Sequence, residues 1–230
     1  CGLGPNAMID EVPVSLTGDD AVDELLAHVQ DGRGHSLVEP SNVIYPPADG
    51  HPCVVLRHVG HDVTGIEAAI SRGVYSALDQ ALAMEPQAVI DQIKSSQLRG
   101  RGGAGFPMGI KLQTVRDSEA PDGSGRRFVV VNFDEGDAGS YIDKELIERD
   151  PHTQIEGVLI TAHAPGAQHA YIYARLEYPK ARQILQTAVT EARNAGRLET
   201  CDITVVRGQG AYICGEETSL LRSLEGLPAL

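Results

Sequence analysis

Apolar residues recur along the chain with two different spacings, which alternate from about residue 61 onward. Apolar residues three or four positions apart are typical of helices, and short continuous apolar runs are typical of buried strands. The predicted helices lie in 65–83 (interrupted near Gly73), 85–96, 150–167, 178–196 and 216–226. The predicted buried strands lie in 127–136, 170–175 and 201–208. Strands that alternate with helices predict an α/β domain with a mainly parallel sheet over residues 61–230.

The first 60 residues follow another pattern. Residues 1–35 combine short strand-like stretches with a helix-spaced segment, 19–32, that ends at Gly32. This predicted hairpin and helix form a unit too small to fold alone. Residues 36–60 lack periodicity and are rich in proline. We interpret them as a linker or an extended crossing segment, in which 53–60 could form one strand.

The composition is that of a globular protein, with 42% hydrophobic and 22% charged residues. The net charge of −13 argues against broad binding to nucleic acids or anionic membranes, because such binding needs a basic surface. The sequence contains neither a signal peptide nor a run of about 18 apolar residues that could cross a membrane. We therefore predict a cytoplasmic protein without direct membrane insertion.

The four cysteines, Cys1, Cys53, Cys201 and Cys214, form no C-x-x-C pair, so the chain carries no self-contained zinc or cluster motif. Reduced cytoplasmic thiols are the simplest interpretation of the last three. Because the chain begins with Cys1, we expect it to be processed or incomplete. The mature end of a bacterial lipoprotein also begins with cysteine, but no polar tether follows here.

Three loops beside the predicted elements carry unusual residues, and the first is the glycine-rich loop, 99–111. Its sequence GRGGAG (100–105) matches G-x-G-x-x-G, but a helix precedes it where a dinucleotide fingerprint needs a strand. It also lacks the Ser or Thr that follows the lysine of a Walker A loop. Consecutive glycines expose main-chain N–H groups, and Arg101 and Lys111 add positive charge. These features favour a phosphate ligand; a flexible surface loop is the alternative.

The second loop, the acidic loop 132–143, carries four carboxylates within ten residues, a density that could indicate a hard metal site. The spacing is not that of an EF-hand. Carboxylates also accept hydrogen bonds from ribose or ribityl hydroxyls, and Asn132 could contact a ring edge. A solvated acidic turn is the third interpretation.

The third loop, 207–218, places Gly215, Glu216 and Glu217 after a predicted strand and at the start of a helix. A helix N-terminus favours anions, so the two glutamates could simply be favourable charges of the first turn. Tyr212, taken alone, would be interpreted as core packing. Ligands of open α/β sheets bind beyond the carboxyl ends of the strands, so this loop is a candidate part of a site.

Together, the three loops resemble the NADH-oxidising flavoprotein family. This family includes the NADH-binding flavoprotein subunit of respiratory complex I, the diaphorase large subunit of NAD-reducing hydrogenases and the flavoprotein subunit of NAD-dependent formate dehydrogenases. The segments that carry the resemblance are SSQLRGRGGAGFPMGIK, VVVNFDEGDAG, ERDPHTQIEG, AYIYARLEYPKA and GQGAYICGEETSLLRSLEG. The resemblance runs from about Val54 to Leu230 and implies a Rossmann-like domain that binds FMN, with NADH stacked on the flavin.

The resemblance also implies roles for individual residues. Those expected along the FMN phosphate and ring are Gly100, Arg101, Gly102, Gly103 and Lys111. Those expected at ribityl and ring atoms, or closing the flavin site, are Asn132, Asp134, Glu135, Gly215, Glu216 and Glu217. Those expected to seat the nicotinamide nucleotide are Phe106, Lys111 and Tyr212. Asp137 stands where the family often has glutamate, and its charge is expected to lower the flavin potential. Hydride transfer between the two cofactors needs no acid–base residue.

The N-terminal sequence CGLGPNAMIDEV resembles the end of a thioredoxin-like [2Fe–2S] module, in which Cys1 would be the last cluster ligand. One chain that carries both modules resembles the hydrogenase and formate dehydrogenase branches more than complex I. Within the family, the sequence of residues 134–157 favours the hydrogenase diaphorase. The implied partners are the diaphorase small subunit and hydrogenase or formate dehydrogenase subunits.

Members of the family continue beyond the position of Leu230, with a further flavin-contacting stretch and a [4Fe–4S] domain. We therefore expect the chain to be a fragment. Two functions of other classes stay open. One is a nucleotide-binding module that transfers no electrons. The other is a phosphotransferase with Mg²⁺ on Asp134 and Asp137.

Overall fold

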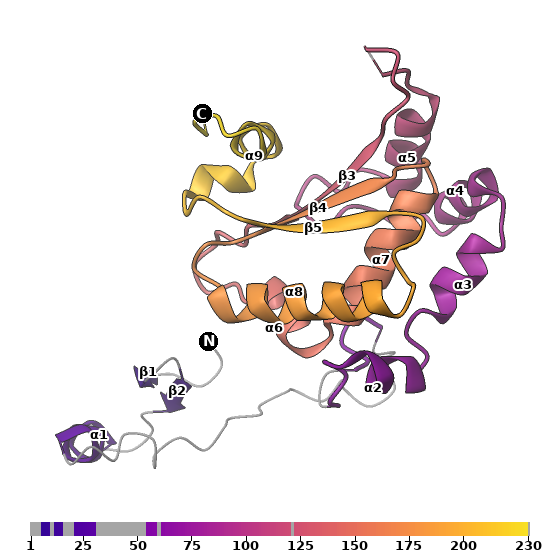
Figure 1. The fold of residues 1–230 in the computed structure, drawn as a ribbon. Helices are drawn as coiled ribbons and strands as arrows, with labels where there is room; N and C mark the ends of the chain where they lie inside the picture. Colours follow the sequence, from indigo (N-terminus) through magenta and orange to yellow (C-terminus); the bar gives the residue numbers. More distant parts are fainter. Residues whose placement is uncertain are drawn as a thin grey trace. The chain divides into compact units, whose positions relative to one another are not determined.

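The computed structural model describes residues 6–9, 12–15, 21–30, 54–58, 61–120 and 122–229 (Figure 1). The chain divides into two compact units, Cys1–Val54 and Val55–Leu230. In the first unit, strands β1 (Asn6–Ile9) and β2 (Val12–Ser15) pair in antiparallel orientation, and helix α1 (Ala21–Gln30) follows. The hairpin and the helix predicted from the sequence are therefore confirmed.

The strand predicted at 53–60 is wrong for the residues that the structure describes there. Residues 54–58 form a turn, and Val54 and Val55 are exposed. His58 is buried, and its Nδ1 atom lies 2.9 Å from Oδ2 of Asp150. The apolar residues of 54–58 thus join no sheet in the described part of the chain. The contact between His58 and Asp150 holds this segment in place.

The second unit is built on a parallel sheet of three strands in the order β3-β4-β5. The strands are β3 (Phe128–Phe133), β4 (His169–Ala174) and β5 (Asp202–Arg207). In the register of the sheet, Asn132 lies beside Tyr173, and Tyr173 lies beside Val206. Both pairs of strands are parallel, so the predicted strands and their parallel arrangement are confirmed. Helices connect consecutive strands, as parallel pairing requires.

Most of the predicted helices are also present. The helices of this unit are α2 (Ile66–Ser71), α3 (Ser76–Leu82), α4 (Pro86–Ser95), α5 (Met108–Asp117), α6 (Ile142–Arg149), α7 (Pro151–His163), α8 (Pro179–Asn194) and α9 (Glu217–Leu224), with a 3₁₀ turn η2 (Tyr212–Gly215). The sequence did not predict α5 and α6. Both are short and carry several charged or polar residues, so their apolar spacing gives a weak signal.

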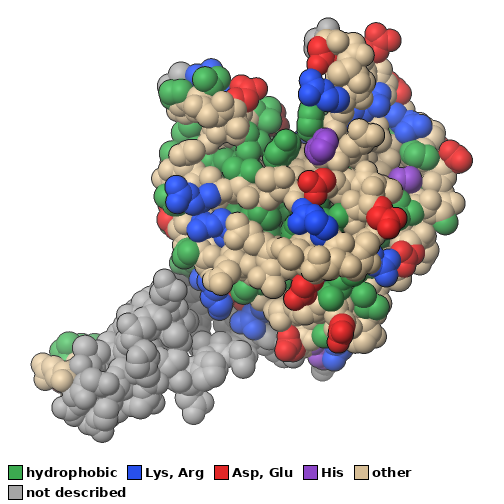
Figure 2. All heavy atoms as spheres, viewed as in Figure 1, with side chains coloured by type: hydrophobic (Ala, Val, Ile, Leu, Met, Phe, Trp, Pro, Cys, Tyr) green, Lys and Arg blue, Asp and Glu red, His purple; other side chains and the backbone are tan. Residues whose placement is uncertain are grey.

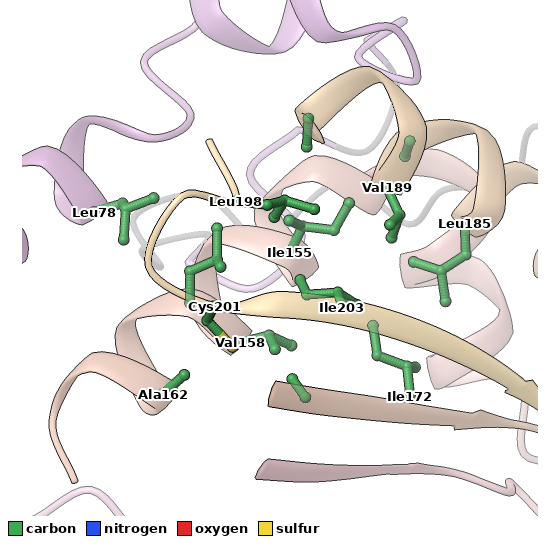
Figure 3. Close-up of a cluster of buried hydrophobic side chains, with 14 of the residues drawn as sticks. Leu78, Ile155, Val158, Ala162, Ile172, Leu185, Val189, Leu198, Cys201 and Ile203 are labelled. Carbon is green, nitrogen blue, oxygen red and sulfur yellow. The ribbon is translucent and has the colours of Figure 1, made fainter. Parts of the chain in front are cut away.

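One face of the sheet carries the main hydrophobic core, covered by α7 and α8 (Figure 1). Figure 3 shows Ile172 of β4 and Ile203 of β5 directed toward Leu185 of α8, with Ile155 and Val158 of α7 completing the cluster. All five side chains are buried. Burial of each such side chain is worth about 1.5–3 kcal/mol, so this face fixes the position of the sheet.

The opposite face is covered by α9, where Tyr173, Cys214 and Leu220 form a smaller core. Figure 2 shows hydrophobic side chains at the surface around α9. Leu221, a residue of this helix, is 47% exposed. The prediction that β3 is a buried strand is only partly correct. β3 is an edge strand of the described sheet, and the side chain of Phe128 is 45% exposed.

Buried polar side chains of α7 connect it to its neighbours. Oε1 of Glu156 accepts hydrogen bonds from the main-chain N–H groups of Ala77 (2.9 Å) and Leu78 (3.0 Å), at the start of α3. His152, which is fully buried, bonds the hydroxyl of Tyr75 at 2.8 Å. These contacts satisfy polar groups that would be costly to bury alone.

Helices α4 and α5 cross very closely at Gly109. A Cβ atom on Gly109 would lie 2.8 Å from the main-chain N of Lys94 and 2.9 Å from its Cα. The crossing is lined by Val89, Ile90 and Leu112, which are all buried. Glycine is therefore required here because two main chains meet.

Candidate functional site

The three parallel strands end at one edge of the sheet, and three polar segments begin there. The acidic loop follows β3, Arg175 follows β4, and the 207–218 loop follows β5. Carboxyl ends of parallel strands meet at the same edge, which is where open α/β sheets bind ligands. The topology thus places two of the three predicted loops side by side.

Glu135 anchors the acidic loop to the start of α6. Its Oε1 accepts hydrogen bonds from Oγ of Ser140 (2.8 Å) and the main-chain N of Asp143 (3.1 Å). Its Oε2 accepts one from the main-chain N of Lys144 at 3.3 Å. The guanidinium of Arg175 donates to the main-chain oxygen of Glu135. The Glu135 carboxylate therefore satisfies helix N-terminal donors, which is a role that the sequence did not predict.

Sequence reasoning missed Arg175 and Tyr178 as parts of the site. The hydroxyl of Tyr178 donates to Oε2 of Glu135 at 3.4 Å, and the Arg175 guanidinium lies 5.3 Å from the centre of the Tyr178 ring. Burial, followed by the charge of Glu135, raises the pKa of Tyr178 to about 12. One signal was available, because Arg175 ends a predicted strand and so had to lie at the carboxyl edge.

Asp134 is the most deeply buried carboxylate of the acidic loop, at 8% exposed. Its main-chain N donates to Oδ1 of Asn132 at 3.0 Å, but none of the described hydrogen bonds ends on its carboxylate. Burial raises the pKa of Asp134, and the positive charge of Arg175 opposes that shift. A carboxylate on a largely buried residue that accepts no hydrogen bond from the protein can accept them from the hydroxyls of a ligand.

Two hydrogen bonds join the acidic loop to the 207–218 loop. Nδ2 of Asn132 donates to the main-chain oxygen of Gly215 at 2.7 Å. The hydroxyl of Tyr212 donates to Oδ1 of Asp137 at 3.1 Å. The structure thus brings together Asn132, Asp137, Tyr212 and Gly215, and their contact with a cofactor stays a prediction. Tyr212 is 72% exposed, so the core-packing interpretation of this residue is wrong.

Glu216 is the N-cap of α9. Its carboxylate accepts hydrogen bonds from the main-chain N–H groups of Thr218 (2.9 Å) and Ser219 (3.0 Å), which lower its pKa. Glu217 lies exposed in the first turn. This arrangement agrees with the helix-start interpretation of both residues. Their contact with a flavin stays a prediction.

The glycine-rich loop connects α4 to α5 and closes on itself. The main-chain N of Gly100 donates to the oxygen of Phe106 at 2.9 Å, and the N of Met108 donates to the oxygen of Leu98 at 2.9 Å. Phe106 is 51% exposed. A Cβ atom on Gly102 or Gly103 would meet nothing within 4 Å, so the glycines leave open space above the loop.

The cations predicted in this loop, Arg101 and Lys111, are also exposed. None of the described hydrogen bonds joins the loop to the acidic loop or to the 207–218 loop. The loop therefore offers exposed N–H groups and positive charge, which suit an anion. Its place opposite the other two loops stays a prediction.

Asp143 makes the site sensitive to pH. Burial, followed by the charge of Glu135, raises the pKa of Asp143 to about 6. A raised folded-state pKa means that the native state holds the proton more tightly than the unfolded chain, so this contribution to stability is lost as pH rises from about 4 to 6. We expect Asp143→Asn to gain stability relative to the natural protein over that interval. Thermal unfolding of both proteins between pH 4 and 8 measures the difference; a difference independent of pH would contradict it.

Within the described ranges, no three His, Cys, Asp or Glu side chains come together as metal ligands. The Mg²⁺ interpretation of Asp134 and Asp137 therefore has no third ligand in this part of the chain. Cys1, the predicted cluster ligand, lies outside the described residues. No helix in the described part of the chain has the length and apolar character needed to cross a membrane.

A parallel α/β sheet with an acidic loop and a helix-capping GEET segment at its carboxyl edge, and a glycine-rich loop before it, defines a Rossmann-like nucleotide-binding domain. The profile of the Nuo51 FMN-binding domain family matches residues 93–229. The chain belongs to this family. The family and the fold class predicted from the sequence are thus confirmed.

Curated relatives extend the comparison. The chain is 46% identical over 172 residues to an NADH-quinone oxidoreductase subunit of Aquifex aeolicus (strain VF5), in a match that covers 71% of this chain and 39% of the relative. It is 44% identical over 174 residues to an NADH-quinone oxidoreductase subunit of Rhodobacter capsulatus, with 72% and 39% covered. The chain therefore spans about two fifths of the length of these relatives.

A solved structure matches almost the whole chain. The NAD⁺-reducing [NiFe]-hydrogenase in its H₂-reduced state aligns with a TM-score of 0.69 and 30% identity, over 98% of this chain and 37% of the matched chain. The air-oxidised state of the same kind of enzyme aligns with a TM-score of 0.63 and 29% identity.

Proposed function

We propose that this chain is the FMN- and NAD(H)-binding part of an NADH:acceptor oxidoreductase that exchanges electrons with iron–sulfur clusters. The observation that carries the proposal is Asp134, a residue that is only 8% exposed and whose carboxylate accepts none of the described hydrogen bonds. It lies at the carboxyl edge of a domain of the FMN-binding family. Hydroxyl groups of a ribityl chain are donors of the required kind.

The residues present fit FMN at both of its ends. Asn132 and Asp134 would hold ribityl and ring atoms, and the open glycines with Arg101 and Lys111 would hold the phosphate. Bound FMN would supply a hydride-accepting ring. The chain itself would orient the nicotinamide nucleotide against that ring and exclude water. Hydride transfer between the two cofactors needs no side chain that moves a proton.

Two observations favour the hydrogenase diaphorase among the possible complexes. The hydrogenase structure aligns with 98% of the chain, so the alignment includes the N-terminal unit as well as the FMN-binding domain. The hairpin and helix of residues 6–30 also fit the end of a thioredoxin-like module fused to the flavoprotein. A formate dehydrogenase or complex I subunit is the alternative. We propose a cytoplasmic protein, with Cys1 as a cluster ligand and diaphorase and hydrogenase subunits as partners.

Absorbance of the full-length protein tests the proposal. We expect flavin bands at about 375 and 450 nm that bleach when NADH is added without oxygen. A protein that stays colourless after FMN reconstitution would contradict FMN binding. A yellow protein that NADH does not bleach would instead support a nucleotide-binding module that transfers no electrons.

A further inference from the structure

Arg175 holds the main chain on both sides of Asp134. Its own main-chain N donates to the oxygen of Phe133 at 3.1 Å, and its guanidinium donates to the main-chain oxygen of Glu135. Phe133 and Glu135 are the two neighbours of Asp134 in the chain. One residue at the end of β4 thus fixes the chain immediately before and immediately after Asp134.

The guanidinium of Arg175 is itself held in place by two further contacts. Its Nε donates to Oε2 of Glu177 at 3.1 Å, and its Cζ lies 5.3 Å from the centre of the Tyr178 ring. The hydroxyl of Tyr178 in turn donates to Oε2 of Glu135 at 3.4 Å. A planar guanidinium loses little freedom for each further hydrogen bond, so these contacts together fix its position beside the acidic loop.

The positive charge of Arg175 also acts on the Asp134 carboxylate. Burial raises the pKa of Asp134, the charge of Arg175 opposes this shift, and the charge of Glu177 adds to it. Three other carboxylates at this edge of the sheet bond other groups, namely those of Glu135, Asp137 and Glu216. Arg175 is thus the cation that favours the ionised form of Asp134.

We propose that Arg175 is a positioning residue of the ligand site, which holds Asp134 in place and keeps its carboxylate ionised for the hydroxyl groups of a ligand. The structure points to a ligand here because Asp134 is only 8% exposed and its carboxylate accepts none of the described hydrogen bonds. The proposal rests on the proposed function, in which a ribityl chain supplies the hydroxyls. An ionised carboxylate accepts at both oxygens, whereas a protonated one turns one oxygen into a donor. Arg175 thus acts on flavin affinity through Asp134.

Equilibrium titration of the flavin-free, full-length protein with FMN, from about pH 5 to 8, tests the assignment. Arg175→Gln removes the charge but keeps an amide that can donate to the oxygen of Glu135. Loss of an adjacent opposite charge raises the pKa of a carboxyl by about 1 or more, so the pH below which FMN affinity falls should move upward by about 1. At about pH 6, Arg175→Gln should therefore bind FMN about three- to tenfold more weakly than the natural protein.

Matched variants separate charge from position. Arg175→Lys keeps the charge but loses the planar fork, so FMN affinity should fall by a similar factor at every pH while the pH profile stays natural. Asp134→Asn removes the titrating group, so Arg175→Gln should leave the pH profile of that variant unchanged. The phosphate of FMN also titrates at about pH 6, but it does so alike in every variant. Arg126→Gln, which removes an exposed cation before the amino end of β3, should match the natural protein.

Thermal unfolding of the flavin-free protein supplies a readout that needs no ligand. The charge of Arg175 stabilises Asp134 only when the carboxylate is ionised, so this contribution is lost as pH falls. Arg175→Gln should therefore cost more stability at about pH 7 than at about pH 4. The part of this difference that comes from Asp134 should disappear in the Asp134→Asn background, and the part that remains reports the ion pair of Arg175 with Glu177.

The outcomes distinguish the inference from the proposed function. An unshifted pH profile in Arg175→Gln, or a shift that persists in the Asp134→Asn background, would overturn the positioning role while the natural protein still binds FMN. A natural protein that binds no FMN would overturn the proposed function and, with it, the role of Arg175 toward a flavin. An upward shift that requires Asp134 supports the inference.

Discussion

Replacing Gly109 with alanine is expected to lower the free energy of unfolding by about 3 kcal/mol, at the upper end of what overpacking costs. The added Cβ would lie 2.8 Å and 2.9 Å from main-chain atoms of Lys94. A main chain cannot rotate away as the tip of a side chain does, so α4 and α5 must separate. That separation would loosen the packing of Val89, Ile90 and Leu112.

Chemical denaturation with urea measures the effect, and Gly157→Ala is the matched control. Gly157 lies inside α7, is exposed, and would place its Cβ with nothing within 4 Å. Since alanine favours a helix over glycine by about 1 kcal/mol, this variant should gain stability. If Gly109→Ala unfolds at the same urea concentration as the natural protein, the close crossing is not present in solution.

The crossing also bears on the site, because the glycine-rich loop connects the two helices. Separation of α4 and α5 moves both ends of that loop. We therefore expect Gly109→Ala to lower FMN affinity as well, through displacement of the loop, because the added methyl group itself meets Lys94 of α4. Gly157→Ala should leave the FMN content unchanged.

Removal of the Glu135 carboxylate is the second change with a large expected effect. Glu135→Ala would leave the N–H groups of Asp143 and Lys144 and the hydroxyl of Ser140 without their acceptor. Each lost partner costs about 1 kcal/mol or more when the group is partly buried. The acidic loop would lose its anchor to α6, and FMN affinity should fall about 30- to 100-fold, equivalent to about 2–3 kcal/mol.

Equilibrium titration of the flavin-free full-length protein with FMN measures this loss. Glu135→Gln is the matched variant, because its amide oxygen keeps one acceptor toward the α6 N-terminus. An anchoring role predicts an intermediate affinity for Glu135→Gln. Equal FMN affinity in Glu135→Ala and the natural protein would show that order in the acidic loop is not needed for binding.

The sequence predicted the sheet well because its strands are strongly apolar and its crossovers are long helices with clear spacing. It failed at α5 and α6, where the apolar pattern is short and interrupted by charge. It also failed at 54–58, where an apolar run resembles a strand but forms a turn with Val54 and Val55 exposed. Local pattern does not reveal whether a run will find strands to pair with.

The candidate site could be located from the sequence, but not all of its internal contacts. The order of loops after strands predicted that Asn132 and Tyr212 would lie at one edge. Nothing in residue type alone distinguished the anchored carboxylate of Glu135 from the unpartnered one of Asp134. Both are acids in the same loop, and only the position of α6, an element that the sequence did not predict, separates their roles.

The alternation of β3 ties recognition to the choice of pairing register. Phe133 faces the main core, while the neighbouring Asn132 faces the other way and bonds Gly215. A slip of β3 by one residue would exchange them, with an amide in the core and a phenyl ring at the site. A chain that pairs β3 in the wrong register would therefore lose the site as well. Correct packing of the core and correct formation of the site depend on the same register.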